Sequence, residues 1–251
     1  MADYVLVHGA WHGGWCWRHV VGPLVAAGHR AHGVTLTGLG ERAHLRSESI
    51  TLETHIADVI GAIEAEEMEQ VVLAVHSYAG MIGTAIADRQ PGRLRHLVYV
   101  DAFVPRPGES WSSTHAGATR EGRLAAARAS SDFSFPPPDP AVFGLSGEDL
   151  AWARRRQTPH PGHTYEATLS FDPQRVATVP RTFVNCTQPA LATIDAIRPR
   201  LTDPLFWDGA WQGGGGVKVI HLPTGHDPMI SSPAEMARIL LALAPRSAAG
   251  R

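Results

Sequence analysis

Short apolar runs rich in β-branched residues alternate along this chain with segments of helical period. The runs are expected to form strands over residues 4–7, 31–36, 71–75, 94–100, 181–185 and 217–222. Between the second and third runs, Ile56, Val59, Ile60 and Ile63 fall on one face of a helix. Strands that alternate with helices are typical of a parallel sheet whose crossovers are helical. The sequence therefore predicts an α/β fold with a mostly parallel central sheet flanked by helices.

The segment of residues 106–179 breaks this alternation. It is rich in Ser, Ala and Arg, contains the proline-rich run at residues 135–140, and carries the scattered aromatic residues Trp111, Phe133, Phe143 and Trp152. A flexible linker is the alternative interpretation, but it would leave these apolar side chains without burial. We expect a single domain, with a core of residues 1–105 and 180–251 and a cap inserted at residues 106–179.

The last part of the chain carries sequence signals for the start of a helix and for a glycine-rich loop. Ser232 and Glu235 have the spacing of a capping box, and Pro233 suits the first position of a helix. We therefore expect the last helix to begin at Pro233. The four glycines at residues 213–216 are expected to form a flexible loop before the last strand.

Composition and charge argue against several classes of partner. The chain of 251 residues has a formal net charge of -2 and no excess of Lys and Arg, so neither a nucleic acid nor a membrane is an expected partner. A small-molecule substrate fits this balance, and a homodimer stays open. Cys16 and Cys186 lie in apolar contexts and are expected to be buried thiols. With no targeting signal before the first strand, we expect a cytoplasmic protein.

Ser77 follows the third predicted strand, in the run Val75-His76-Ser77-Tyr78-Ala79. A serine on a sharp strand-to-helix turn presents its hydroxyl above the sheet, and such a turn favours small residues two positions to either side. Ala79 meets that preference, whereas Val75 is bulky. A serine that merely caps a helix is the alternative, so the case for a nucleophile depends on other parts of the chain.

Two other strand ends carry candidates for the oxyanion hole and the general base that a serine nucleophile needs. After the first strand, a glycine-rich turn exposes backbone N–H groups, and those of Ala10 and Tyr78 could form an oxyanion hole, although a plain strand–helix turn is the alternative. After the last strand, His226 can take the proton of Ser77 as a general base, and the order of Ser before His agrees with this fold. We therefore expect Ser77 and His226 to form a catalytic pair.

Several runs of the sequence resemble the plant methylesterase and hydroxynitrile lyase branch of the α/β-hydrolases and its bacterial esterase relatives. They lie at residues 8–15 (HGAWHGGW), 37–42 (TGLGER), 76–78 (HSY), 99–105 (YVDAFVP) and 225–226 (GH). The resemblance covers nearly the whole chain. It implies the α/β-hydrolase fold, Ser–His chemistry, an oxyanion hole from the Ala10 and Tyr78 amides, and a cap that shapes an apolar pocket.

The catalytic acid departs from that branch. There an aspartate follows the strand that corresponds to residues 183–187, but this chain continues with Gln-Pro-Ala at residues 188–190. Some α/β-hydrolases outside the branch carry the acid one strand earlier, where this chain has Asp101. We expect Asp101 to hold the tautomer of His226, with a structural bond to nearby backbone as its alternative role. Asp195, Asp203 and a dyad without an acid are the other candidates.

A second departure separates this chain from hydroxynitrile lyases. Those lyases differ from the esterases by a threonine in the first turn and a lysine directly after the histidine, where this chain has Gly9 and Asp227. A carboxylate beside the histidine would repel a developing cyanide. Cyanogenic lyase activity is therefore not expected.

The leading hypothesis is a carboxylesterase-like serine hydrolase that acts on a small carboxylic ester with an apolar or aromatic portion through an acyl-Ser77 intermediate. Its pocket is expected to include Gly9, Trp111, Phe133, Phe143 and Trp152, although the four aromatic residues could equally form the core of the cap. An alternative is a cofactor-free C–C lyase or cyclisation enzyme that uses His226 as a base on a natural-product intermediate. A small-ligand binding module with a decayed hydrolase site is a third hypothesis.

No metal and no cofactor are expected. His8, His12 and His76 lack the spacing of metal ligands on a helix face. The run Gly-Leu-Gly at residues 38–40 lacks the third glycine of a dinucleotide-binding fingerprint.

Overall fold

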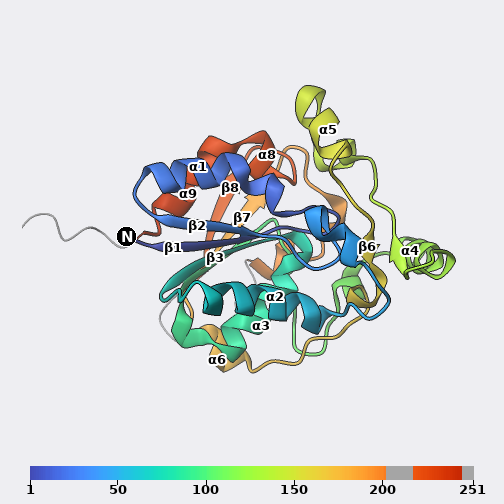
Figure 1. The fold of residues 1–251 in the computed structure, drawn as a ribbon, viewed down its shortest axis with the longest axis horizontal. Coiled ribbons are helices and arrows are strands. Elements are labelled where there is room, and N and C mark those ends of the chain that lie inside the picture. The colour runs from blue at the N-terminus through green and yellow to red at the C-terminus, as the bar shows by residue number, and fades with distance from the viewer. Residues whose placement is uncertain (202–216, 245–251) are drawn as a thin grey trace, which may run out of the picture.

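Six parallel strands form one sheet in the computed structural model, which describes residues 1–201 and 217–244 (Figure 1). Their order across the sheet is β2-β1-β3-β4-β7-β8, and each neighbouring pair is parallel. The strands are β1 (Asp3–Val7), β2 (Arg30–Val34), β3 (Val71–His76), β4 (Leu94–Val100), β7 (Arg181–Cys186) and β8 (Val217–Leu222). Each one coincides with an apolar run of the sequence, so the predicted sheet is confirmed.

Helices cover both faces of the sheet, as Figure 1 shows. One face carries α1 (Arg18–Ala26), α8 (Pro228–Ser231) and α9 (Pro233–Leu241), and the opposite face carries α2 (Leu52–Ala65), α3 (Gly80–Arg89) and α6 (Pro173–Ala177).

Successive residues of each strand point to opposite faces, so the sheet has a core on each side. Val5 and Val7 join the core under α2 and α3, whereas Tyr4 and Leu6 join the core beside α1 and α9. Because helices bury both faces, the central strands β1 and β3 are apolar at nearly every position instead of alternating with polar residues.

The segment between β4 and β7 lies mostly beyond one end of the sheet, on the right of Figure 1. It contains α4 (Gly117–Ala129), α5 (Gly147–Arg154) and a small antiparallel sheet of β5 (Ser134–Phe135) and β6 (His160–Pro161). Its last helix, α6, instead packs beside α3 of the core. Trp111 and Phe143 of this segment are buried, which a flexible linker would not provide.

Short 3-10 helices make up much of the remaining connections. They are η1 (Gly14–Trp17), η2 (Gly40–Leu45), η3 (Ser77–Ala79), η4 (Pro91–Arg93), η5 (Trp111–Thr114), η6 (Pro140–Phe143), η7 (Gly162–Thr164), η8 (Ala192–Ile194) and η9 (Arg198–Leu201). One of them, η3, begins at Ser77, so the sharp turn after β3 leads directly into α3.

The last helix begins at Pro233 as predicted, but the predicted capping box is absent. Ser232 makes no side-chain cap hydrogen bond. Its backbone N–H donates to the carbonyl oxygen of Pro228 at 2.9 Å, because Ser232 also ends α8, and Glu235 pairs with Arg238. The backbone N–H that a capping box requires is therefore already used.

Two other sequence predictions concern the chain as a whole. Cys16 and Cys186 are free and buried, as predicted. Within residues 1–201 and 217–244, no helix has the length and apolar character needed to cross a membrane. The glycine run at residues 213–216 and the candidate acid Asp203 lie outside the described residues.

Candidate active site

Ser77 stands at the sharp turn between β3 and α3. Its φ is +54°, in the left-handed region that a residue other than glycine adopts only where its surroundings hold it. The Ser77 carbonyl oxygen accepts a hydrogen bond from the N–H of Phe103 at 2.9 Å. Gly80 allows this close approach, because a Cβ at that position would collide with the Phe103 carbonyl oxygen. The turn is therefore a strained elbow that is pinned to the chain following β4.

Val75, the bulky residue of the elbow, is accommodated by a glycine in the following helix. A Cβ at Gly83 would lie 2.8 Å from Cγ2 of Val75, so only glycine leaves room for the valine side chain. In this elbow the small residue is therefore Gly83 of the following helix, and position 75 can hold a valine. The elbow therefore accommodates Val75 although this residue is bulky.

Three side chains from three strand ends form a hydrogen-bonded chain. Ser77 Oγ lies 3.0 Å from His226 Nε2, and His226 Nδ1 lies 2.7 Å from Asp101 Oδ2. Because an ionised carboxylate can only accept, Nδ1 carries the ring proton and Nε2 is free to accept the Ser77 hydroxyl. All three residues are buried. The structure thus brings together the residues nominated as nucleophile, base and acid.

Asp101 lies at the end of β4, one strand before the place that the family resemblance indicated. Its Oδ1 accepts a hydrogen bond from the N–H of Cys186 at 3.2 Å and lies 3.4 Å from the Arg198 guanidinium. Asp195 contacts the same guanidinium at 2.6 Å, but its side chain is 63% exposed. Of the aspartates in the described ranges, Asp101 alone lies within hydrogen-bond distance of the His226 side chain.

The turn after β1 lies against the elbow, because β1 and β3 are neighbours in the sheet. The strand order changes direction at this pair, and such switch points form the binding crevices of open α/β sheets. A Cβ at Gly9 would lie 2.7 Å from Ser77 Cβ, so glycine is needed for this approach. No described residue accepts a hydrogen bond from the backbone N–H of Ala10 or Tyr78.

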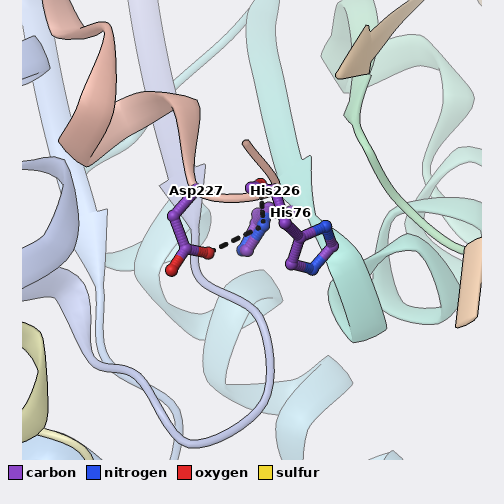
Figure 2. Close-up of side chains that lie close together, drawn as sticks. All are labelled: His76, His226 and Asp227. Carbon is purple, nitrogen blue, oxygen red and sulfur yellow. Dashed lines mark hydrogen bonds and ion pairs between the residues drawn. The ribbon is translucent and has the colours of Figure 1, made fainter. Parts of the chain in front are cut away.

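Two histidines and a carboxylate form a second buried cluster behind the triad, and Figure 2 shows part of it. His76 Nε2 donates to the carbonyl oxygen of His226 at 2.9 Å and lies 3.4 Å from Asp227 Oδ1. Asp227 Oδ2 lies 3.2 Å from His12 Nε2, and His12 Nδ1 donates to the Ala10 carbonyl oxygen at 2.7 Å. The cluster therefore connects the turn after β1, the elbow and the loop after β8.

The hydrogen bonds of this cluster define its charges. Both ring nitrogens of His12 face acceptors, so the ring is an imidazolium beside the Asp227 carboxylate. Burial opposes the charge on His12, but Asp227 and the two hydrogen bonds raise its pKa above the usual value. Burial also opposes the ionised form of Asp227, yet His12 lowers the pKa of that carboxyl to about 2. His76 is neutral, because burial and the neighbouring His226 hold its pKa well below the usual value.

The compensated charge of Asp227 changes one argument from the sequence. The carboxylate is fully buried and is paired with His12, so its negative charge is largely balanced. Repulsion of cyanide by Asp227 therefore cannot carry the case against a hydroxynitrile lyase. What remains of that case is the absence of the threonine, where this chain has Gly9, and of the lysine, where it has Asp227.

The same cluster offers potential metal ligands. One donor atom from each of His76, His226 and Asp227 lies within 4.8 Å of the others. Both ring nitrogens of His226, however, already contact Ser77 and Asp101. A metal ion bound through His226 would therefore displace one of the triad contacts.

Two of the aromatic residues predicted for the pocket lie beside the triad. The ring centroid of Phe143 is 5.5 Å from that of His226, and the ring centroid of Trp111 is 5.1 Å from that of Tyr78. The backbone oxygen of Phe143 also accepts a hydrogen bond from the N–H of His226 at 2.8 Å. Phe143 therefore contacts both the backbone and the ring of His226.

The other two predicted pocket aromatics pack elsewhere. Phe133 stacks on His163 with ring centroids 4.2 Å apart. Trp152 on α5 packs edge-on against Trp15, with centroids 4.9 Å apart. The first contact lies within residues 106–179 and the second joins this segment to η1, and neither ring makes a ring contact with His226 or Tyr78 among the described residues.

Sequence reasoning missed the role of several neighbours of the triad. His12 and Arg198 contact Asp227 and Asp101 respectively, and neither contact has a sequence signal because the partners are far apart in the chain. Trp11 stacks on Phe143 with centroids 6.1 Å apart. Its position directly after Ala10 was the signal that could have identified it.

Comparison with known proteins identifies relatives along the whole chain. The model of the family described as the alpha/beta hydrolase family matches residues 4–239. The carbendazim hydrolyzing esterase of Nocardioides sp. (strain SG-4G) is 40% identical over 252 residues, which cover 97% of this chain and 100% of that protein. Methylesterase 7 of Arabidopsis thaliana is 27% identical and covers 98% and 97% of the two chains.

A solved structure has the same fold. An extracellular alpha/beta-hydrolase from a Paenibacillus species superposes with a TM-score of 0.78, at 19% sequence identity and with coverage of 98% of this chain and 100% of that one.

Proposed function

Because the chain belongs to the alpha/beta hydrolase family, we propose that it is a serine-dependent esterase that acts on small carboxylic esters through an acyl-Ser77 intermediate. The observation that carries the proposal is the chain of contacts from Ser77 Oγ through His226 to Asp101, at 3.0 Å and 2.7 Å. The esterase names of its relatives support the class of reaction.

In the first half of the reaction, Ser77 Oγ attacks the ester carbonyl carbon and transfers its proton to His226 Nε2. The carbonyl oxygen becomes an oxyanion, which the N–H groups of Ala10 and Tyr78 stabilise by about 3 kcal/mol each, as such donors do elsewhere. Asp101 stabilises the imidazolium that forms on His226. The ring then gives its proton to the leaving alcohol oxygen as the carbon–oxygen bond breaks.

The second half repeats these steps with water. Water attacks the acyl carbon and transfers a proton to His226 Nε2, and His226 returns that proton to Ser77 Oγ as the carboxylic acid departs. Atoms and charge balance over the cycle: one ester and one water give one acid and one alcohol. No cofactor is required for any step.

The substrate proposed for this site has an apolar or aromatic portion. Phe143, Trp111 and Trp11 bring aromatic surface next to the catalytic groups, which favours such a group near the reacting carbonyl. Residues 106–179 would act as the cap that carries two of these three rings.

The lyase or cyclisation alternative rests on a missing acid and on the bulky Val75. Asp101 contacts His226, and Gly83 makes room for Val75, so neither feature now favours that alternative. A decayed hydrolase site is also disfavoured by the contacts between Ser77, His226 and Asp101.

The proposal is tested with a fluorophosphonate probe and a panel of methyl and aryl esters. Wild type is expected to hydrolyse members of the panel and to be labelled, whereas Ser77→Ala loses both the label and turnover. Intact-protein mass spectrometry should detect an acylated protein in wild type alone. Turnover retained by Ser77→Ala would contradict the proposed mechanism, because no acyl-Ser77 could then be obligatory.

A further inference from the structure

Arg123 on α4 is surrounded by four aromatic rings. Its guanidinium carbon lies 5.1 Å from the ring centroids of both Trp11 and Trp111, 5.3 Å from that of Tyr165 and 5.9 Å from that of Phe135. We call these four rings the aromatic cage. A cation that lies over aromatic faces is attracted by their quadrupoles, and this attraction offsets part of the loss of hydration. The cage therefore holds a charged side chain within a mostly apolar part of the cap.

The positive charge in the aromatic cage has no acidic partner among the described residues. Arg123 NH1 contacts His115 Nδ1 at 3.2 Å, and burial together with Arg123 lowers the pKa of His115 to about 3, so this ring is neutral. Burial raises the pKa of Tyr165, which is neutral too. Arg120, three residues earlier on the same helix, differs because it is paired with Glu166.

An arginine stays protonated in proteins, so the cage retains one uncompensated unit of charge. Burial of a charge is costly unless an opposite charge or strong hydrogen bonds accompany it. The hydrogen-bond partners of the Arg123 guanidinium, His115 Nδ1 and the Tyr165 hydroxyl, are both neutral. A carboxylate could instead bind the edge of a guanidinium through two parallel, charge-assisted hydrogen bonds. The cage thus lacks the partner for which the guanidinium edge is best suited.

The aromatic cage adjoins the triad through two chains of ring contacts. Trp11 stacks on Phe143, whose ring lies 5.5 Å from that of His226. On the other side, Trp111 lies 5.1 Å from Tyr78, which directly follows Ser77 in the elbow. Trp11 also follows Ala10 in the chain. These ring contacts link Ser77 and His226 with the cage around Arg123.

We propose that Arg123 and the aromatic cage form an anion-binding subsite beside the triad, and that the preferred substrates are esters that carry a second, ionised carboxylate. Monoesters of dicarboxylic acids have this chemistry: the ester lies at Ser77, the carboxylate binds the guanidinium edge, and the connecting carbon skeleton packs on the rings. This inference rests on the proposed function and adds a substrate class to it.

The test compares two substrates of nearly the same shape that differ in charge: monomethyl terephthalate, which has a carboxylate, and methyl 4-carbamoylbenzoate, which has a neutral amide. Monomethyl adipate and methyl adipamate form a second, more flexible pair. Wild type is expected to favour the carboxylate of at least one pair by about 10- to 100-fold in kcat/KM, the usual size of a charge-assisted interaction. Arg123→Gln should lose this preference while retaining the activity on the neutral ester.

Arg120→Gln is the matched control, since it makes the same chemical change on the same helix at a residue that is paired and half exposed. It should keep the wild-type preference. Arg123→Lys should retain a reduced preference, because its ammonium keeps the charge but not the two-bond geometry. A wild type without any preference for the carboxylate, or a preference that survives in Arg123→Gln, would overturn the inference and leave the esterase function intact.

Binding to the Ser77→Ala protein separates the two proposals, because it needs no turnover. Calorimetry should give monomethyl terephthalate a lower Kd than methyl 4-carbamoylbenzoate, and the additional change Arg123→Gln should remove the difference. If wild type hydrolyses no ester and is not labelled by the fluorophosphonate probe, the esterase proposal fails. The comparison of Kd values still tests whether Arg123 binds a carboxylate. Equal Kd values for the acid and the amide in the Ser77→Ala protein would refute the subsite.

Discussion

Replacement of Asp101 by asparagine isolates the charge of the triad acid. The change keeps the size of the side chain, and the amide oxygen can still accept from the N–H of Cys186. The NH2 group then faces His226 Nδ1, which must become the acceptor. The ring proton therefore moves to Nε2, where it prevents His226 from accepting the proton of Ser77.

The expected cost is large because the tautomer and the stabilisation of the imidazolium are lost together. Such a substitution in a serine–histidine–aspartate triad lowers kcat by about 10⁴-fold, or about 5 kcal/mol at 1.36 kcal/mol per tenfold. The 2.7 Å contact between His226 Nδ1 and Asp101 Oδ2 is short and fully buried, so solvent cannot substitute for it. The Ser77 hydroxyl and the oxyanion amides remain in place, which leaves a residual activity.

Asp195→Asn is the matched control. Asp195 contacts the same Arg198 guanidinium, but its side chain is 63% exposed, so the change should alter kcat/KM by no more than about twofold. Steady-state kinetics on one aryl ester, with thermal unfolding of each variant to check folding, makes the comparison. Equal losses in the two variants, or a loss of less than tenfold in Asp101→Asn, would refute Asp101 as the acid.

Three further predictions concern stability and the elbow. Gly80→Ala should destabilise the protein by about 2 kcal/mol or more and abolish labelling of Ser77, because the new Cβ collides with the Phe103 carbonyl oxygen. A variant with the wild-type free energy of unfolding in urea and with wild-type labelling by the fluorophosphonate probe would contradict this. Gly61→Ala, on an exposed and open part of α2, should instead stabilise by up to about 1 kcal/mol, and a loss of stability would count against the helix geometry. His12→Gln should reveal the buried ion pair through pH. Because the pKa of His12 is raised on folding, its charged form stabilises the fold fully below the unfolded pKa of about 6.5, and this stabilisation is lost as pH rises through the folded pKa. Because the pKa of Asp227 is lowered to about 2, its carboxylate stabilises the fold fully above the unfolded pKa of about 3.9, and this stabilisation is lost as pH falls through about 2. The difference in unfolding free energy between wild type and His12→Gln should therefore be greatest between about pH 4 and 6.5, and a difference that does not vary with pH would argue against the ion pair.

The pattern of the sequence was sufficient for the sheet and for two residues of the site. Apolar runs and helical spacing are local properties, so they predicted all six strands, which the structure confirms. Short sequence motifs carried the resemblance to the plant methylesterase branch, which is confirmed as well. Parallel strands place their carboxyl ends at one sheet edge, and Ser77 and His226 follow two such ends. Their proximity therefore followed from the order of elements alone.

Tertiary structure brought one of the candidate acids, Asp101, into contact with His226 and supplied the other neighbours of these residues. Asp101 and His226 lie 125 positions apart, and His12 and Asp227 lie 215 positions apart. No local pattern encodes such contacts, because they depend on the strand order and on the paths of the loops between strands. Gly83 resolved the problem of Val75 for the same reason, since its role appears only when α3 is packed on β3.

The cap shows the same division. Its sequence indicated aromatic residues that needed burial, but only the packed structure separated Trp111 and Phe143, which lie beside the triad, from Phe133 and Trp152, which pack elsewhere. No sequence pattern distinguishes Arg123 from the other arginines of this segment. The sequence thus determined the fold and the positions of Ser77 and His226 at strand ends through spacing along the chain, whereas the contact of Asp101 with His226 and the surroundings of the site were decided by which distant segments the folded chain brings together.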